Sequence, residues 1–365
     1  MRRWVETRWV NPFVLLRWTE DQRVNEQLVV LARSGVIRDL LVKSSSALKF
    51  DSGFFRLGPV SLPKSVVQSS GAAVRELMAR TDQARRRRAR QLVEDLVDRP
   101  NRTRGLGQLL VLNYFFDEIC GTRSAALHAL TRRYVNESVV PDDIRHLGLT
   151  HYRNLRRMRL DLAVQMRKLD RGLGDPADLV EIALRATSDP DEAAEVYFRL
   201  VLSVVGFTGA ALEWLLIDCG LYREQLNGSS DCYEFVRESL RLHSPACRLS
   251  REVDQAVDVG GTSLRPGDEV LLNIHAANRD PQAFNRPSTF LVERPRVERA
   301  RELSFGKGVR SCPVQNEATG CMVAFAEALQ GRRVQFKPQP FSRMIVGTLT
   351  VPPKGKLIVG PKVAL

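Results

Sequence analysis

The segment from Val201 to Ile217 constrains the fold most, because it is predicted to be a helix without a polar face. Asp189 followed by Pro190 predicts the start of this helix, since proline is favoured in a first helical turn. A helix that is apolar all round lies in the middle of a large protein. Gly206 and Gly209 cost about 1 kcal/mol each relative to alanine, so we expect a bulky group or a packing partner to lie flat against them.

Helical spacing predominates up to residue 242 and a period of two follows it, so we predict a mainly α fold with small antiparallel β-sheets (α+β). With no repeat, linker or composition shift, we predict a single domain over residues 1–365. Helices are predicted at 20–31, 36–42, 69–97, 106–120, 123–134, 152–173, 233–242 and 318–329. Strands are predicted at 54–62, 249–253, 257–259, around 264 and at 269–274, with Gly-Gly and Pro-Gly turns.

Charge and cysteine usage narrow the class of protein. The net charge is +13, and arginines cluster at 85–88 and 90, which individually fit a solvated helix face. Because only 7% of residues are aromatic, an acidic protein partner is favoured over nucleic acid. No uncharged run approaches the roughly 18 residues that span a bilayer, so we expect a cytoplasmic protein without a membrane anchor. The six cysteines have neither disulfide-framework nor zinc-site spacing.

One cysteine has the surroundings of a metal ligand. In the stretch Leu303–Pro313, Gly306 and Gly308 suit a tight loop, and Cys312 precedes a predicted helix. Backbone N–H groups and the helix dipole at such a position favour a thiolate over a thiol. A buried structural cysteine is the alternative.

The order Phe305-Gly306-x-Gly308-x-Arg310-x-Cys312 resembles the haem-binding loop of cytochrome P-450, the haem-thiolate monooxygenases. Three further motifs of that family precede it in matching order: Glu238-x-x-Arg241 on a helix, Arg251 beginning a strand, and Asn278-Arg279. The resemblance is convincing over about the last half of the chain. It implies a cytochrome P-450-like fold with a shortened or divergent N-terminal part.

The resemblance also implies roles for these residues. Cys312 would be the axial ligand of the iron in haem b, and Phe305, Gly306 and Gly308 would line the cofactor. Arg251 and Arg310 match positions that pair with the haem propionates, where guanidinium supplies bidentate donors. For Arg251 a solubilising charge at a strand edge is the alternative. Glu238 and Arg241 match the pair that braces the core against Asn278 and Arg279, with a surface ion pair as the alternative.

The predicted apolar helix would cross the other face of the haem. The resemblance then places Thr208 at the oxygen-activating alcohol, with Gly206 nearby. The acid that usually precedes this threonine is absent, so protons would arrive by another route or the chemistry would differ from ordinary hydroxylation. Thr208 could equally be a core hydroxyl bonded to its own helix. Val314 stands where the family prefers glycine.

Two functions are open at this point. The first is a monooxygenase that oxidises a small organic or peptide-like substrate, as in the tailoring of natural products, and receives electrons from an acidic ferredoxin. The second is a haem-less relative that activates a partner enzyme such as a glycosyltransferase. Such relatives generally lose the cysteine loop, which this chain retains, so the enzyme is favoured.

Overall fold

The computed structural model describes residues 19–49, 64–79, 83–121, 124–139, 149–169, 174–228, 231–339, 345–346 and 349–362. These residues form two compact units, each described by itself below. The cysteine unit comprises 19–49, 234–312, 345–346 and 349–351, and the helical unit comprises the other described residues. The single domain of 1–365 remains a prediction.

The cysteine unit is built on a four-stranded sheet in the order β1-β2-β7-β4. Its strands are β1 (Gln22–Arg23), β2 (Leu28–Leu31), β7 (Glu269–Asn273) and β4 (Arg248–Glu252). β5 (Val257–Val259) and β6 (Thr262–Leu264) form a separate hairpin, and β9 (Ile345–Val346) pairs with β10 (Leu349–Thr350). Helical elements are α3 (Ser34–Val42), η1 (Ser45–Ala47), α14 (Cys232–Leu242, with its first two residues in the helical unit), α15 (Ile274–Ala277), α16 (Arg296–Arg299) and η6 (Gly308–Arg310).

Two predictions for this unit were wrong. Residues 20–31 form β1 and β2 instead of a helix, because Leu28–Leu31 is fully buried and pairs with β7. The sheet is also not wholly antiparallel, since β2 runs parallel to β7 with Leu28 opposite Glu269. A buried run of four apolar residues fits a strand covered on both faces as well as a helical segment, and spacing alone does not separate them. The sheet, α3 and Leu303 share one hydrophobic core.

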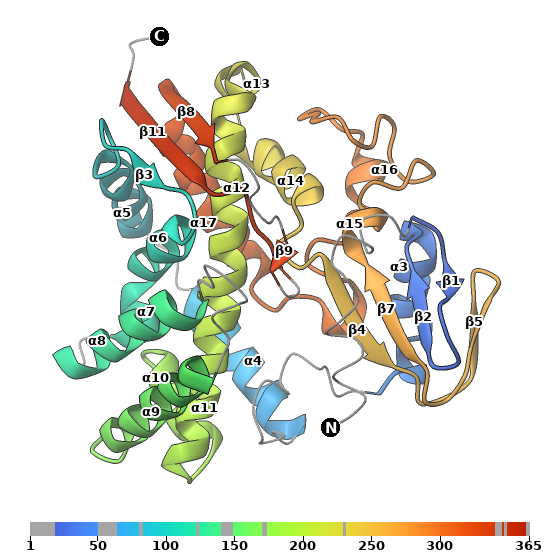
Figure 1. Ribbon diagram of the computed structural model, residues 1–365, viewed down its shortest axis with the longest axis horizontal. Coiled ribbons are helices and arrows are strands. Elements are labelled where there is room, and N and C mark those ends of the chain that lie inside the picture. Colours follow the sequence, from blue (N-terminus) through green and yellow to red (C-terminus); the bar gives the residue numbers. More distant parts are fainter. Residues whose placement is uncertain are drawn as a thin grey trace. The chain divides into compact units, whose positions relative to one another are not determined.

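The helical unit surrounds one long helix (Figure 1). It runs through α11 (Pro190–Val201), the π-helical turn η5 (Leu202–Phe207) and α12 (Thr208–Leu221). α6 packs on α12, while α9 and α10 pack on α11 (Figure 1). The other helices are α4 (Lys64–Ala79), α5 (Gln83–Glu94), α6 (Leu106–Tyr114), α7 (Phe116–Cys120), α8 (Ala125–Tyr134), the π-helix η3 (Val135–Val139), α9 (Leu149–Met166), α10 (Leu179–Ala186), α13 (Arg223–Gly228) and α17 (Gln315–Leu329).

The predicted burial of the central helix agrees with the structure. The stretch Pro190–Leu221 is long and apolar enough to cross a membrane by composition, yet 83% of its most apolar window is buried inside the protein. We therefore describe it as a core helix. Gly209 has a packing partner, because a Cβ there would lie 2.6 Å from the backbone of Gln108 on α6.

Several boundaries differ from the prediction. The region 69–97 contains α4 and α5, and 106–120 is divided into α6 and α7 at Phe115. The predicted strand at 54–62 lies outside the described residues. The arginine run on α5 is not uniformly solvated, since Arg85 is buried and its guanidinium pairs with Glu118.

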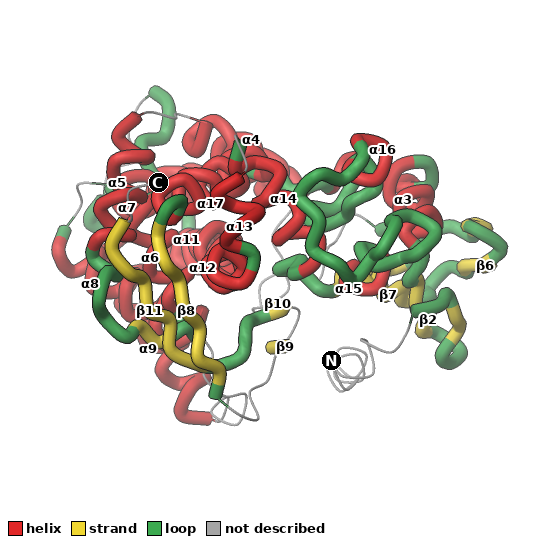
Figure 2. The backbone as a smooth tube through the Cα atoms, turned by 90° about the horizontal axis from the view of Figure 1, so that it is seen from above, coloured by secondary structure: helices red, strands yellow, loops and turns green. Residues whose placement is uncertain are grey.

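A three-stranded antiparallel sheet closes the helical unit, in the order β3-β11-β8. Its strands are β3 (Asn101–Arg102), β11 (Gly355–Lys362) and β8 (Arg332–Pro338). Figure 2 shows β11 and β8 side by side, joined to a unit that is otherwise mostly helix. This sheet pairs β11 with β3, which lies just before the start of α6 in the sequence.

Candidate functional site

The loop before Cys312 is tightly turned and held by its own backbone. Gly306 and Gly308 have φ of +69° and +70°, which favours glycine. The Cys312 N–H donates to the Phe305 carbonyl at 2.8 Å. A Cβ on Gly308 would meet the Leu41 carbonyl oxygen at 2.3 Å, so the loop lies directly on α3. The side chain of Cys312 is therefore presented by a rigid turn, and α17 begins three residues further along the chain.

Cys312 differs from the other cysteines in its exposure. It is partly exposed, whereas the other five are buried, and none of the six forms a disulfide. Burial raises the pKa of the Cys247 thiol to about 11 and of the Cys232 thiol to about 12. It also raises the pKa values of the remaining three, at positions 120, 219 and 321. The buried thiols are thus held in the neutral form, which is a poor metal ligand.

Two arginines of the same unit form a cationic site. Arg251 on β4 is only 8% exposed, and its Nε has no hydrogen-bond partner within the described part of the chain. Desolvation and then the charge of Arg310 lower its pKa to about 10. Arg310 donates to the carbonyls of Leu48 and Lys49, at 3.3 and 2.5 Å. A buried guanidinium beside a second one, without a carboxylate bonded to it among the described residues, is suited to an anionic group.

Glu238 and Arg241 form a bidentate pair in the core. Arg241 Nε and Nη2 each donate to the carboxylate of Glu238 at 2.8 Å, and the side chains of Arg241 and Glu238 are only 2% and 3% exposed. Arg241 also donates to the carbonyls of Asn278 at 2.6 Å and Pro287 at 2.7 Å. A third residue that sequence reasoning missed joins them. Arg294 Nε donates to both Glu238 oxygens, at 3.0 and 2.8 Å.

Asn278 and Arg279 connect this cluster to neighbouring segments. The Asn278 side chain accepts from the Leu303 N–H at 2.8 Å and donates to the hydroxyls of Ser304 and Ser244. Arg279 donates to the Leu242 carbonyl at 2.5 Å. The asparagine therefore links the end of α14 to the start of the cysteine loop. Nothing distinguished Arg294 or the two serines in the sequence, because isolated arginines and serines in loops are common.

The loop has a second anchor on α14 that the sequence did not indicate. Arg237 Nε donates to the buried Glu302 carboxylate at 2.7 Å. Glu302 directly precedes Leu303, which is fully buried in the core of the unit. The Arg237 side chain of α14 thus fixes the segment that leads to Cys312.

Thr208 and Gly206 lie in the helical unit. Thr208 begins α12, is 7% exposed, and its hydroxyl makes no hydrogen bond within the described part of the chain. Gly206 belongs to η5, the π-helical turn immediately before it. Single π-helical turns inside α-helices are frequent at functional sites, because they shift the register of backbone carbonyls. Thr208 and Gly206 thus belong to the helical unit, whereas Cys312 belongs to the cysteine unit.

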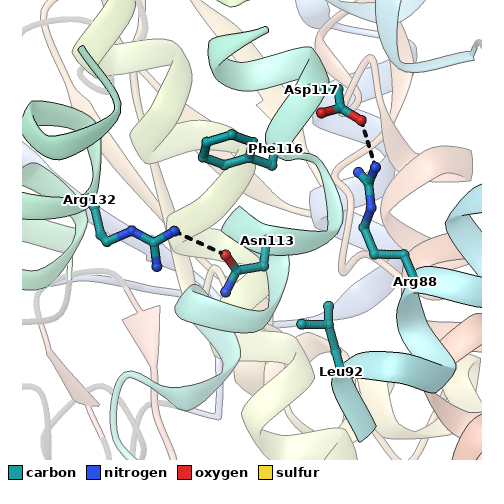
Figure 3. Close-up of a pocket in the computed structure, with 6 residues that line it drawn as sticks. All are labelled: Arg88, Leu92, Asn113, Phe116, Asp117 and Arg132. Atoms are coloured by element: carbon teal, nitrogen blue, oxygen red, sulfur yellow. Dashed lines mark hydrogen bonds and ion pairs between the residues drawn. The ribbon is translucent and has the colours of Figure 1, made fainter. Parts of the chain in front are cut away.

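A surface pocket of about 340 Å³ lies elsewhere in the helical unit (Figure 3). Its arginines are already engaged, Arg88 with Asp117 at 2.6 Å and Arg132 with the Asn113 side chain at 3.4 Å. None of the residues predicted for the site lines it. We do not assign it a ligand.

Comparison with known proteins shows a likeness to one family. Residues 233–357 match the family model described as Cytochrome P450. Cyclooctatin synthase of Streptomyces melanosporofaciens is 32% identical over 222 residues, which cover 50% of this chain and 48% of that protein. Cytochrome P450 109 of Bacillus spizizenii is 27% identical over 37% of this chain and 35% of its own length. The chain thus spans half or less of these relatives.

The solved structures show that the whole fold is shared. The structure of P450 RauA, complexed with a biosynthetic intermediate of aurachin RE, matches with a TM-score of 0.74 over 96% of each chain, at 18% identity. The fold is therefore that of the cytochromes P450. With the match of residues 233–357 to the family model, the chain resembles the cytochrome P450 superfamily in both sequence and fold.

The likeness to this superfamily implies a haem cofactor, and the residues present fit one. Haem carries two carboxylates, and Arg251 offers a buried donor that has no hydrogen-bond partner among the described residues. Cys312 offers a partly exposed sulfur on a rigid turn in the same unit. The donor set thus has both a soft ligand for iron and cations for the propionates.

Proposed function

We propose that this chain is a monooxygenase that uses haem b, with the Cys312 thiolate as axial ligand, to oxidise a small organic or peptide-like substrate. The observation that supports it best is the rigid turn that presents the one partly exposed cysteine in the unit that also contains the Arg251–Arg310 site. A haem held by a thiolate supplies activation of dioxygen and cleavage of its O–O bond. The names of the relatives, a synthase and a protein bound to a biosynthetic intermediate, favour tailoring of a natural product.

The residues of the cysteine unit have distinct roles in this proposal. Arg251 and Arg310 bind the propionates and thereby orient the cofactor. Gly306 and Gly308 allow the positive φ angles of the turn, Gly308 keeps it close to α3, and the Phe305 carbonyl accepts from the Cys312 N–H. The network of Glu238, Arg241, Asn278 and Arg279 positions the turn, because Asn278 bonds the backbone of Leu303 directly.

In the helical unit we assign Thr208 the handling of protons at the oxygen site, with Gly206 leaving room beside it. The hydroxyl is not engaged with the described residues, so it is able to donate to a bound ligand and accept from water. Neither Gly206 nor Phe207 carries an acid. Protons are therefore expected to arrive through ordered water or groups of the substrate.

The electrons are proposed to come from a ferredoxin in the cytoplasm. Relatives of the superfamily generally use redox partners, and a net charge of +13 favours an acidic one. Attraction between exposed charges is screened by salt. The rate of reduction by an acidic ferredoxin should consequently fall as the ionic strength rises.

Substitution of the ligand tests the proposal. Purified protein, expressed with a haem precursor, should be coloured, and its reduced carbon-monoxide complex should show the red-shifted Soret band of a thiolate-ligated haem. Cys312→Ser should abolish that band, whereas Cys247→Ser, which changes a buried thiol, should retain it. Colourless wild-type protein would favour the haem-less accessory function, and a band that survives in Cys312→Ser would reject Cys312 as the ligand.

A further inference from the structure

Helix α9 has an outer face that the proposed oxidation does not use. Its inner face is made of Met158, Leu162, Ala163 and Met166, each at most 1% exposed, and α9 packs through it against α8 and α11. On the outer face, Leu160 is 52% and Val164 44% exposed. Large aliphatic side chains at this spacing normally face the core of a protein, so two exposed neighbours call for an explanation.

Four exposed residues of α9 form one straight row. Arg153, Arg157, Leu160 and Val164 are spaced i, i+4, i+7 and i+11, which places them on a single face of the helix. Arg156 is exposed at the edge of the row. We call these five residues the α9 row. It combines a cationic half with an aliphatic half.

The charges of the α9 row are not neutralised within the described part of the chain. Two arginines outside the row do have partners on α11: Arg159 pairs with Glu195 at 2.8 Å and Arg167 with Asp191 at 3.2 Å. By contrast, Arg153, Arg156 and Arg157 make no ion pair with the described residues. The one acid of α9, Asp161, is half-buried, and its charge contributes to the raised pKa of Arg133 on α8.

We propose that the α9 row is a docking surface for an acidic protein that presents an amphipathic helix. Leu160 and Val164 would pack into the groove of a facing helix on the partner. Carboxylates that flank the apolar face of that helix would pair with the three arginines of the α9 row. A lipid surface is a poorer fit, since interfacial helices bury a broad apolar face rich in aromatic residues, and this row has two aliphatic residues. Nucleic acid is disfavoured because no aromatic side chain accompanies the arginines in the row.

The test uses the full-length protein and a fluorescein-labelled synthetic peptide. The peptide forms an acidic amphipathic helix, with leucines at i, i+4, i+7 and i+11 and glutamates at the flanking positions. Its binding is measured by fluorescence anisotropy at increasing NaCl. We expect the double variant Arg153→Glu/Arg157→Glu to weaken binding about tenfold or more, with a smaller dependence on salt. Leu160→Ser/Val164→Ser should weaken it comparably and leave the salt dependence unchanged.

The matched control is Arg87→Glu/Arg90→Glu on α5, which changes the net charge equally at two other exposed arginines. This variant should change the affinity less than about twofold. Equal weakening by both arginine pairs would show general charge attraction and overturn the proposal. So would binding of the wild type to phosphatidylserine vesicles but not to the peptide. Self-association that the α9 variants abolish, measured by sedimentation velocity, would overturn it in favour of a second copy.

Discussion

Two buried glutamates, one in each unit, are stabilised in opposite ways. Glu238 of the cysteine unit accepts hydrogen bonds from the guanidinium groups of Arg241 and Arg294 and from the Leu291 N–H. Glu213 on α12 instead accepts from the Gly105 N–H at 2.5 Å. It also accepts from the Gln108 side-chain nitrogen at 2.7 Å, with the amide oriented so that its oxygen accepts from the Ala210 N–H. Desolvation raises the pKa of Glu213 to about 8.

The difference shows what each carboxyl group does. Glu238 is the anionic centre of a charged cluster, and removing it would leave two guanidinium groups buried. Glu213 bonds the backbone N–H of Gly105, which precedes α6 and has φ of +88°. A neutral carboxyl group accepts such a hydrogen bond, as a carboxylate does. Replacing the carboxyl group by the neutral amide of glutamine should therefore destabilise the protein at Glu238 and be tolerated at Glu213.

The largest effect is expected from Glu238→Gln. The amide cannot balance the charges of Arg241 and Arg294, and breaking a buried ion pair from one side costs about 3–5 kcal/mol. We expect insoluble or haem-free protein, or a loss of this size in urea unfolding. Normal haem content and unchanged stability would refute the bracing role of the cluster.

Glu213→Gln should change the pH dependence of stability more than stability itself. In the wild type the folded-state pKa lies above the unfolded one, so the unfolded chain ionises first as pH rises from about 4.5 to 8. The free energy of unfolding should thus fall as the pH rises through this window, with a slope of up to about 1.4 kcal/mol per pH unit. The glutamine variant should lack this contribution. Parallel urea-unfolding profiles across the window would contradict the assignment.

Gly209→Ala tests whether the environment of Glu213 depends on the close approach of α6 and α12. The new Cβ would lie 2.6 Å from Gln108 backbone atoms, and overpacking of this kind costs about 1–3 kcal/mol. As α6 moves away, water should reach Glu213 and weaken its pH effect. Gly71→Ala on α4, where nothing lies within 4 Å, is the control and should stabilise by up to about 1 kcal/mol. Equal melting temperatures of the two variants would be inconsistent with this packing.

The smallest effect is expected at a surface pair. Arg133 and Glu137 are bonded at 2.8 Å with 42% and 38% exposure. Glu137→Gln should change the free energy of unfolding by about 0–1 kcal/mol, with less effect at high salt. A loss as large as that in Glu238→Gln would remove the distinction between buried and exposed pairs.

Predictions from the sequence succeeded where a local pattern carries the information. The apolar run around Gly206 predicted a buried helix, and the glycine spacing before Cys312 predicted a tight turn. They failed where partners come from distant segments. Residues 28–31 became a strand because β7, more than 230 residues later, pairs with them. Arg294 and the Arg237–Glu302 pair were missed for the same reason, since no short-range spacing marks either.

The sequence by itself indicated the family resemblance, the candidate ligand and the position of the core helix, because each depends on residue types at fixed short spacings. Only the tertiary structure decided that Gly209 faces α6, that Glu238 serves two arginines and that the arginines of the α9 row face outward. Burial and charge pairing arise between segments far apart in the chain, and hydrophobic spacing within one segment does not encode them.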